Sequence, residues 1–347
     1  MRKANAPAVS RADRLPSTAG VMARLAYARA KAAGIALDPL LRTAGLSRHQ
    51  IEDQRTVIKV RHQVEFLNLV AAALNDDLLG FHLAQTADLR EVGLLYYLLA
   101  SSETLIDALH RAERYSSIVN EGVSLRCVDS RFVRISFHCI GIGRHLDTHQ
   151  IECMMTTAVR ICRQLTGRRL LPERVRLMHH RPQNKEFTKF FGDRVEFGAA
   201  ADDVTFPHNI RQSPVTSADP YLNRLLVSHC EEAIAHRPRT QGSFRSSVEN
   251  AIVPLLPHGK ARASEIARQL GVSQRTLARQ LSQEGLTFSD LLDSLRSDLA
   301  KRYLADRDLA ISQIAWLLGY QDVGAFSHAF KRWTGKAPGK ARVELAP

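Results

Sequence analysis

The feature that most constrains this chain is an internal repeat within its last hundred residues. An isoleucine, an alanine and a glycine occur twice with the same spacing, 48 positions apart: Ile266, Ala267 and Gly271, then Ile314, Ala315 and Gly319. A repeat at such a period indicates one structural unit that is present in two copies. The chain should therefore contain two similar helical units near its end.

Each copy meets the requirements of two helices joined by a tight turn. The alanine lets the helices approach closely, and the glycine four residues later tolerates the left-handed backbone that ends the first helix. Ser273 and Asp322 are suited to cap the second helix. Apolar pairs at an offset of 49 bury one face of that helix, so the second turn has one extra residue: Leu277 and Leu281, then Phe326 and Phe330. Two helix-turn-helix units are predicted.

The segment between the copies predicts a helix over residues 289–304. Its apolar residues form one helical stripe: Phe288, Leu291, Leu292, Leu295, Leu299 and Tyr303. A helix of this length spans roughly 24 Å. Successive major-groove faces of DNA lie about 34 Å apart, which a strut plus the width of the units can bridge. One chain can then read two adjacent turns of DNA.

The exposed faces of the two second helices are the candidate DNA-binding surfaces. We predict these contacts: Gln274, Arg275, Thr276 and Arg279 in the first unit, and Val323, Gly324, Ser327, His328, Lys331, Arg332 and Lys336 in the second. Arg275 and Arg279 are one turn apart and can grip guanine edges or phosphates. Lys331, Arg332 and Lys336 are assigned to phosphate, and simple solvation of these charges is the alternative.

The segment from Phe326 to Pro338 resembles the C-terminal signature of AraC/XylS-type transcription regulators, and the resemblance extends over about Ser246 to Arg342. It implies a DNA-binding domain with two helix-turn-helix units. The chain departs from the usual motif at His328, where Arg is common, and at Ala341, where Tyr or Phe commonly precedes Arg342.

The first half is similar to one N-terminal domain class of the same family. The similar segments are Asp77 to Ala84, Gly93 to Leu95, Ser101 to Leu105, Ala108-Leu109 and Arg114-Tyr115. That class occurs in regulators of the ornithine-utilisation type and is labelled arabinose-binding-like. The resemblance implies an effector-sensing and dimerising domain, but it identifies neither the effector nor the residues that bind it.

The fold class expected is mainly α with a small α+β part. Apolar spacing is helical from Thr18 to about Gly122, and period-two alternation then predicts a hairpin over 124–137. A helix at 147–165, short strands at 174–178, 194–197 and 203–206 and a helix at 185–191 should form a mostly antiparallel sheet with helices packed on it, open or closed. The predicted domains are 18–220 for sensing and dimerisation, 221–243 for a helix and linker, and 244–347 for DNA binding, with the linker itself at 236–243.

Composition limits the classes of partner. The net charge of +13 favours a polyanion, either nucleic acid or an anionic membrane surface. No apolar run is long enough to span a membrane, and residues 1–16 look like a polar tail. The five cysteines are scattered without a close pair, which argues against a disulfide scaffold or a four-cysteine zinc site and suits the cytoplasm.

Two other classes of function were weighed. His145, His149 and Glu152 fall at helical spacing beside Cys153, which suggests a metal-binding enzyme, but the Glu between two His that a metalloprotease needs is absent. A membrane-surface protein would need basic amphipathic helices, whereas Asp290, Asp293 and Asp298 flank the apolar stripe.

The sequence thus predicts a non-enzymatic, sequence-specific regulator without metal or cofactor that binds double-stranded promoter DNA and no membrane. A ligand-responsive activator is favoured, with an unidentified small-molecule effector, RNA polymerase and a second copy as further partners. A constitutive regulator whose first domain only dimerises is the alternative.

Overall fold

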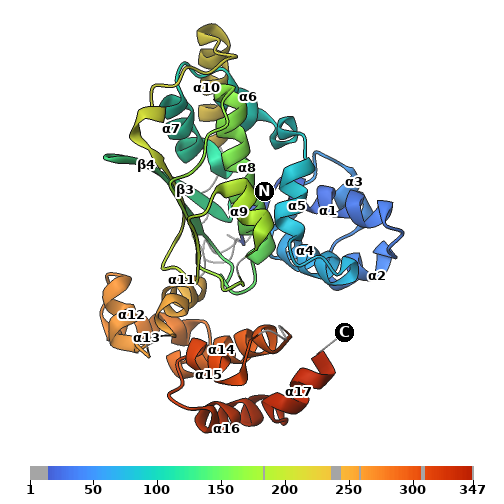
Figure 1. Cartoon of the computed structure of the whole chain (residues 1–347), viewed down its shortest axis with the longest axis vertical. Coiled ribbons are helices and arrows are strands. Elements are labelled where there is room, and N and C mark those ends of the chain that lie inside the picture. The colour runs from blue at the N-terminus through green and yellow to red at the C-terminus, as the bar shows by residue number, and fades with distance from the viewer. Residues whose placement is uncertain (1–14, 183, 236–243, 258, 306–308, 346–347) are drawn as a thin grey trace, which may run out of the picture.

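The computed structural model describes residues 15–182, 184–235, 244–257, 259–305 and 309–345. The predicted linker over 236–243 and the predicted tail up to residue 14 lie outside these residues. We call the described residues before 236 the N-terminal region and those from 244 onward the C-terminal region. Their apolar cores are separate, and most of the chain is helical with a small sheet, as predicted (Figure 1).

The N-terminal region begins with a group of helices that has its own core. They are α1 Val21–Ala32, α2 Leu37–Thr43, α3 Arg48–Glu52, α4 Val60–Leu74 and α5 Leu79–Thr86. Ala26 and Ala30 of α1 are small enough for α4 to approach closely, and Phe66 of α4 is buried in the core that the two helices share. A two-stranded pair that the helical spacing did not predict joins β1 Ser17–Thr18 to β2 Ile58–Lys59.

A five-stranded sheet follows, built from β3 Val123–Asp129, β4 Phe132–Cys139, β5 Arg174–Leu177, β6 Val195–Phe197 and β7 Asp202–Pro207. Its order is β3-β4-β7-β5-β6, and every pair is antiparallel except β5 with β6. The mostly antiparallel sheet is therefore confirmed. Within the described chain its two edge strands do not pair with each other, so the sheet is open.

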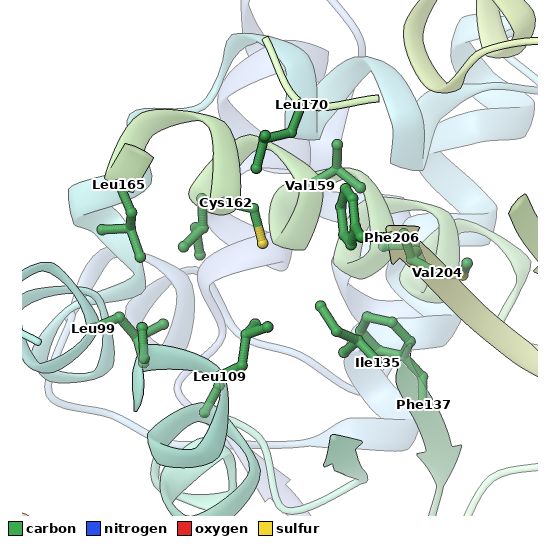
Figure 2. Close-up of a cluster of buried hydrophobic side chains, with 14 of the residues drawn as sticks. Leu99, Leu109, Ile135, Phe137, Val159, Cys162, Leu165, Leu170, Val204 and Phe206 are labelled. Carbon is green, nitrogen blue, oxygen red and sulfur yellow. The ribbon is translucent and has the colours of Figure 1, made fainter. Parts of the chain in front are cut away.

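Helices cover one face of this sheet. Of these helices, α7 Leu105–Tyr115 and α8 Thr148–Thr166 contact the strands. The α6 helix, Leu94–Ala100, packs on both of them, α10 Pro220–Ala235 packs on α6, and α9 Lys185–Phe191 packs beside β6. Alternation along β4 buries Val133, Ile135 and Phe137 against α8 (Figure 2). Cys230 of α10 is also buried in this core, so α10 packs on the N-terminal region.

The C-terminal region is entirely helical among its described residues. It consists of α11 Phe244–Ile252, α12 Ala263–Gln269, α13 Gln274–Gln283, α14 Phe288–Ala305, α15 Ile311–Leu317, α16 Val323–Thr334 and α17 Pro338–Leu345. The α14 helix matches the strut predicted over 289–304. Its residues Leu291, Leu295 and Leu299 are buried in a core that both repeat copies share.

Candidate nucleic-acid interface

The first repeat copy forms a helix-turn-helix from α12 and α13. Ile266 and Ala267 are buried between the helices, and Gly271 has a φ of +67°, the left-handed backbone that the sequence predicted. The hydroxyl of Ser273 accepts a hydrogen bond from the backbone N–H of Thr276 at 3.1 Å. The predicted cap of the second helix is confirmed.

The second copy repeats this geometry with α15 and α16. Gly319 has a φ of +80°, and a Cβ at this position would collide with the backbone oxygen of Leu256. A carboxylate oxygen of Asp322 accepts a hydrogen bond from the N–H of Ala325 at 2.7 Å and caps α16. The turn between the helices spans residues 318–322, one more than the 270–273 turn of the first unit.

In the first unit the predicted DNA-binding residues lie opposite the buried face of α13. Leu277 and Leu281 face the core, whereas Gln274, Arg275 and Arg279 are exposed. Within the described residues, neither arginine has an ion-pair partner. Thr276 is half-buried, and its hydroxyl lies 2.9 Å from that of Ser273. Thr276 therefore belongs to the cap as well as to the candidate surface.

In the second unit the exposed face of α16 carries both uncharged and basic residues. Phe326, Ala329 and Phe330 are buried. Of the predicted contact residues on α16, Ser327 is half-buried and the other five are exposed: Val323, Gly324, His328, Lys331 and Arg332. Lys336, beyond the end of α16, is exposed as well. Arg332 forms an ion pair of 2.8 Å with Asp293 of α14. The contact of all these residues with DNA stays a prediction.

The strut α14 is fastened to the turn of the second unit by Arg296. Its Nε donates to the backbone oxygen of Leu318 at 3.0 Å, and its guanidinium lies 4.8 Å from the centre of the Tyr320 ring. Tyr320 in turn packs against Phe326 and Trp333. This anchor fixes the orientation of the second unit on the strut.

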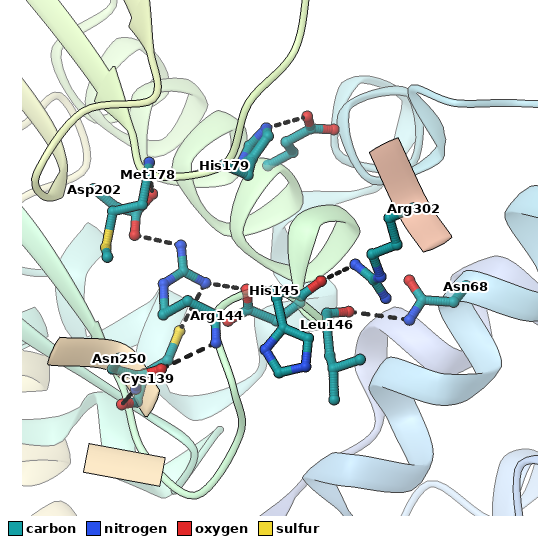
Figure 3. Close-up of polar contacts among 12 residues, drawn as sticks. Asn68, Cys139, Arg144, His145, Leu146, Met178, His179, Asp202, Asn250 and Arg302 are labelled. Atoms are coloured by element: carbon teal, nitrogen blue, oxygen red, sulfur yellow. Dashed lines mark hydrogen bonds and ion pairs between the residues drawn. The ribbon is translucent and has the colours of Figure 1, made fainter. Parts of the chain in front are cut away.

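The two regions are joined by polar contacts that the sequence did not reveal (Figure 3). The side-chain oxygen of Asn250 in α11 accepts from the N–H of Arg144 at 3.0 Å, and its amide donates to the backbone oxygen of Cys139 at 3.3 Å. Arg302 of α14 donates to the backbone oxygen of His145. No motif marks these residues, because the contacts use backbone atoms of a loop between β4 and α8.

That loop is held by a buried ion cluster. Arg144 pairs with Asp147 and with Asp202, and all three side chains are almost completely buried. Burial alone disfavours the charge, yet the two carboxylates hold the pKa of Arg144 well above its usual value. Asp202 also accepts from the N–H of Met178 at 2.9 Å. Removing one member of such a cluster leaves an unpaired buried charge, at a cost of about 3–5 kcal/mol.

Of the histidines considered for metal binding, His145 is buried at this contact and His149 is half-buried on α8. His145 precedes α8, which begins at Thr148, so His145 and His149 do not share a helix face. Burial and the nearby Arg302, Arg245 and Arg144 lower the pKa of His145 to about 3. Burial lowers the pKa of His149 to about 4. Both rings are neutral near pH 7.

The carboxylate of Glu152 is already hydrogen-bonded to a histidine and an arginine. It accepts hydrogen bonds from Nε2 of His179 at 2.9 Å and from Nε of Arg181 at 3.0 Å. Across the described ranges, no group of three or more His, Cys, Asp or Glu side chains is placed to hold a metal ion. None of the described helices is both long and apolar enough to cross a membrane.

Both halves of the chain match known protein families. Residues 34–215 match the arabinose-binding domain of AraC transcription regulators, and residues 266–343 match a helix-turn-helix domain. The first match alone covers more than half of the chain. The chain belongs to the AraC family of transcription regulators, and it is a DNA-binding regulator with an N-terminal domain of the ligand-binding type.

Curated relatives are similar to this chain over most of their own length. The ornithine utilization regulator of Pseudomonas aeruginosa is 28% identical over 78% of this chain and 80% of its own. The transcriptional regulator VirS of Mycobacterium tuberculosis is 28% identical over 81% of this chain and 83% of its own. The crystal structure of the regulator CdpR from Pseudomonas aeruginosa is 23% identical, covers 88% of this chain and 96% of its own, and has a TM-score of 0.42.

Proposed function

We propose that the chain is a ligand-responsive activator that places its two helix-turn-helix units in adjacent major grooves of a promoter. The observation that carries this proposal is the pair of capped helices, α13 and α16, each with one face in a shared core and one polar face exposed. The connecting strut α14 has 18 residues, which corresponds to about 27 Å of helix. That length suits two units on successive turns of DNA.

Different roles are assigned to the two units. Arg275 and Arg279, for which the described residues provide no ion-pair partner, contact base edges, since each guanidinium can donate two parallel hydrogen bonds to guanine. Val323 and Gly324 offer no side-chain hydrogen bonds, so the second unit reads shape and thymine methyl groups. Lys331, Arg332 and Lys336 contact phosphates.

The proposed response to a ligand is supported by the positions of β4, α8 and the loop that connects them. The β4 strand and α8 both contribute to the apolar core of the N-terminal region, and the loop between them makes the contacts with α11 and α14. A change in that core can therefore alter how the C-terminal region is held. RNA polymerase and a second copy of the chain are the further partners proposed, in the cytoplasm, where promoter DNA lies.

The rival within this class is a constitutive regulator whose N-terminal region only dimerises. The contacts of Asn250 and Arg302 favour the responsive activator, because a region that only dimerises has no need to touch the strut. A regulatory role without catalysis or a cofactor agrees with relatives that are transcription regulators.

The test uses a fragment of residues 244–347 alongside the full chain. DNA that binds the full chain is first selected from a random pool. The affinity of the full chain and of the fragment for the selected DNA is then measured at several salt concentrations. Affinity should fall steeply with salt because phosphate contacts release counterions. The double variant Arg275→Ala/Arg279→Ala should lose selective binding, whereas Arg268→Ala, an exposed arginine already paired with Glu265, should not. A folded fragment that binds no DNA contradicts the proposal.

A further inference from the structure

An apolar cavity of about 150 Å³ lies inside the N-terminal region, between α6, α7, β4 and α8. Figure 2 shows side chains from these elements around a common space; those that line the cavity include Leu99, Leu109, Ile135, Phe137, Cys162 and Leu165. A dry cavity of this volume is large enough for a benzene-sized molecule. The core that joins the sheet to α8 is thus incompletely filled by the protein itself.

The lining excludes charged ligands. Among the described residues around the cavity there is no Lys, Arg or His, and Asp88 is the only acidic one. Asp88 is already paired with Arg90 at 2.6 Å, and hydrogen bonds from Arg90 lower its pKa to about 2. A carboxylate or an ammonium group would lose its hydration here without gaining a partner of opposite charge. A free amino acid, which carries both charges, fits poorly for the same reason.

Two buried polar atoms of the lining lack hydrogen-bond partners among the described residues. Gln63 is fully buried; its amide donates to Gln150 at 3.0 Å, and its Oε1 is left without a donor. Asn120 is 5% exposed; its side-chain oxygen accepts from the N–H of Gly122 at 2.8 Å, and its Nδ2 has no acceptor. Buried polar atoms are almost always paired, so one free acceptor and one free donor beside a cavity point to a ligand.

We infer that this cavity binds a neutral amphiphile, namely a short alkyl or aryl group with a single amide or hydroxyl head. The apolar part fills the space beside Leu109 and Phe137. The head accepts from Nδ2 of Asn120 and donates to Oε1 of Gln63. The inference rests on the proposed ligand response and names the class of effector.

The probe is hexanamide, whose primary amide has both the acceptor and the donor that the head requires. Its binding to the full chain is measured by calorimetry without DNA, with hexanoate as a charged control of the same carbon number. Hexanamide should bind at least tenfold more tightly than hexanoate. Equal affinity for the two, or no binding of hexanamide, overturns the inference.

Two variants locate the site. Ala158→Leu extends a side chain that lines the cavity and should abolish binding, whereas the same change at the exposed Ala32 of α1 should not. Gln63→Met keeps the length of the side chain but removes the acceptor. It should weaken hexanamide about fivefold, in line with the loss of one hydrogen bond, and leave toluene binding unchanged. Unaltered hexanamide binding by both cavity variants contradicts the assignment.

DNA binding is then measured with and without hexanamide. A change in affinity for the selected DNA supports both the cavity assignment and the ligand response. If hexanamide binds with the expected variant pattern and DNA affinity stays the same, the cavity assignment stands and the ligand-responsive part of the proposed function fails. The two failures are therefore distinguishable.

Discussion

The two helix-turn-helix units share one backbone plan but differ in what they expose and in how they are held. The first unit exposes Arg275 and Arg279, neither of which has an ion-pair partner in the described part of the chain. It packs against α11, which contacts the N-terminal region through Asn250. The second exposes Val323 and His328, and its Arg332 is tied to the strut. One repeated sequence pattern thus produces two units with different chemistry on the DNA-facing side.

The difference shows that a conserved geometry leaves the choice of contacts to a few exposed positions. The first unit has exposed arginine donors for bases and lies next to α11, which contacts the N-terminal region. The second is anchored on α14 through Arg296, which contacts Leu318 and the Tyr320 ring, and its exposed cations suit phosphates. We expect the first unit to set sequence preference and the second to add affinity.

The largest effect on stability should come from a substitution that leaves a cavity in the core beneath the second unit. Phe330 is 1% exposed, and Phe330→Ala should lower the free energy of unfolding by about 3–5 kcal/mol because it leaves a cavity. Denaturant unfolding of the 244–347 fragment measures this change. The exposed Lys331→Ala serves as the control and should shift stability by less than about 0.5 kcal/mol. A small effect of Phe330→Ala would mean that the second unit is not packed on the shared core.

Next in size is the loss of a base contact in the first unit. Arg279→Ala should cost about 1–3 kcal/mol on the selected DNA and relax the preference at one base pair. Lys331→Ala should weaken binding to all sequences alike and reduce the salt dependence. Binding-site selection with both variants compares the two units directly. Identical behaviour of the two variants contradicts the division of roles.

A smaller effect is expected from pH at the contact between the regions. His145 and His149 have pKa values lowered to about 3 and about 4 from 6.5 in the folded protein, so the unfolded chain binds more protons below pH 6.5. Stability should therefore fall as pH drops from 7 to 5.5, by about 1 kcal/mol for each histidine.

Burial raises the pKa of Asp147 and of Glu249 nearby, so uptake of protons by these carboxylates in the folded protein opposes this loss as the pH falls. The measurement is denaturant unfolding of the full chain at the two pH values. The 244–347 fragment, which lacks both histidines, is the control and should show no such loss. An equal loss in the fragment would place the titrating groups elsewhere.

The smallest effect concerns His328, where the chain departs from the usual motif. His328→Ala should cost less than about 1 kcal/mol in DNA binding, as for one ordinary hydrogen bond. His328→Arg should tighten binding generally, because a guanidinium offers five donors and a permanent charge. Gel-shift titrations on the selected DNA compare both variants with the parent chain. Loss of specific binding in His328→Ala would show that the second unit also reads bases.

Local rules were enough to place most of the helices and strands of this protein. The repeat located both helix-turn-helix units, the glycines at 271 and 319 and the caps Ser273 and Asp322, because a turn of this kind needs a left-handed residue and a side-chain acceptor at fixed positions. Period-two alternation located β3 and β4. The exposed residues of α13 and α16 followed from which face is apolar.

The tertiary structure alone decided which side chains from distant parts of the sequence are in contact. The spacing of His145 and His149 gave no sign that the His145 ring is buried against the strut, ahead of the helix that begins at Thr148. The contacts of Asn250 and Arg302 left no periodic signal, because they depend on how the end of β4 and the loop before α8 pack against the C-terminal region. The unfilled cavity left none either, because it depends on how the helices and the sheet of the N-terminal region pack together. Spacing along a chain records the period of each element, whereas contacts between elements are set by the packing of the whole fold.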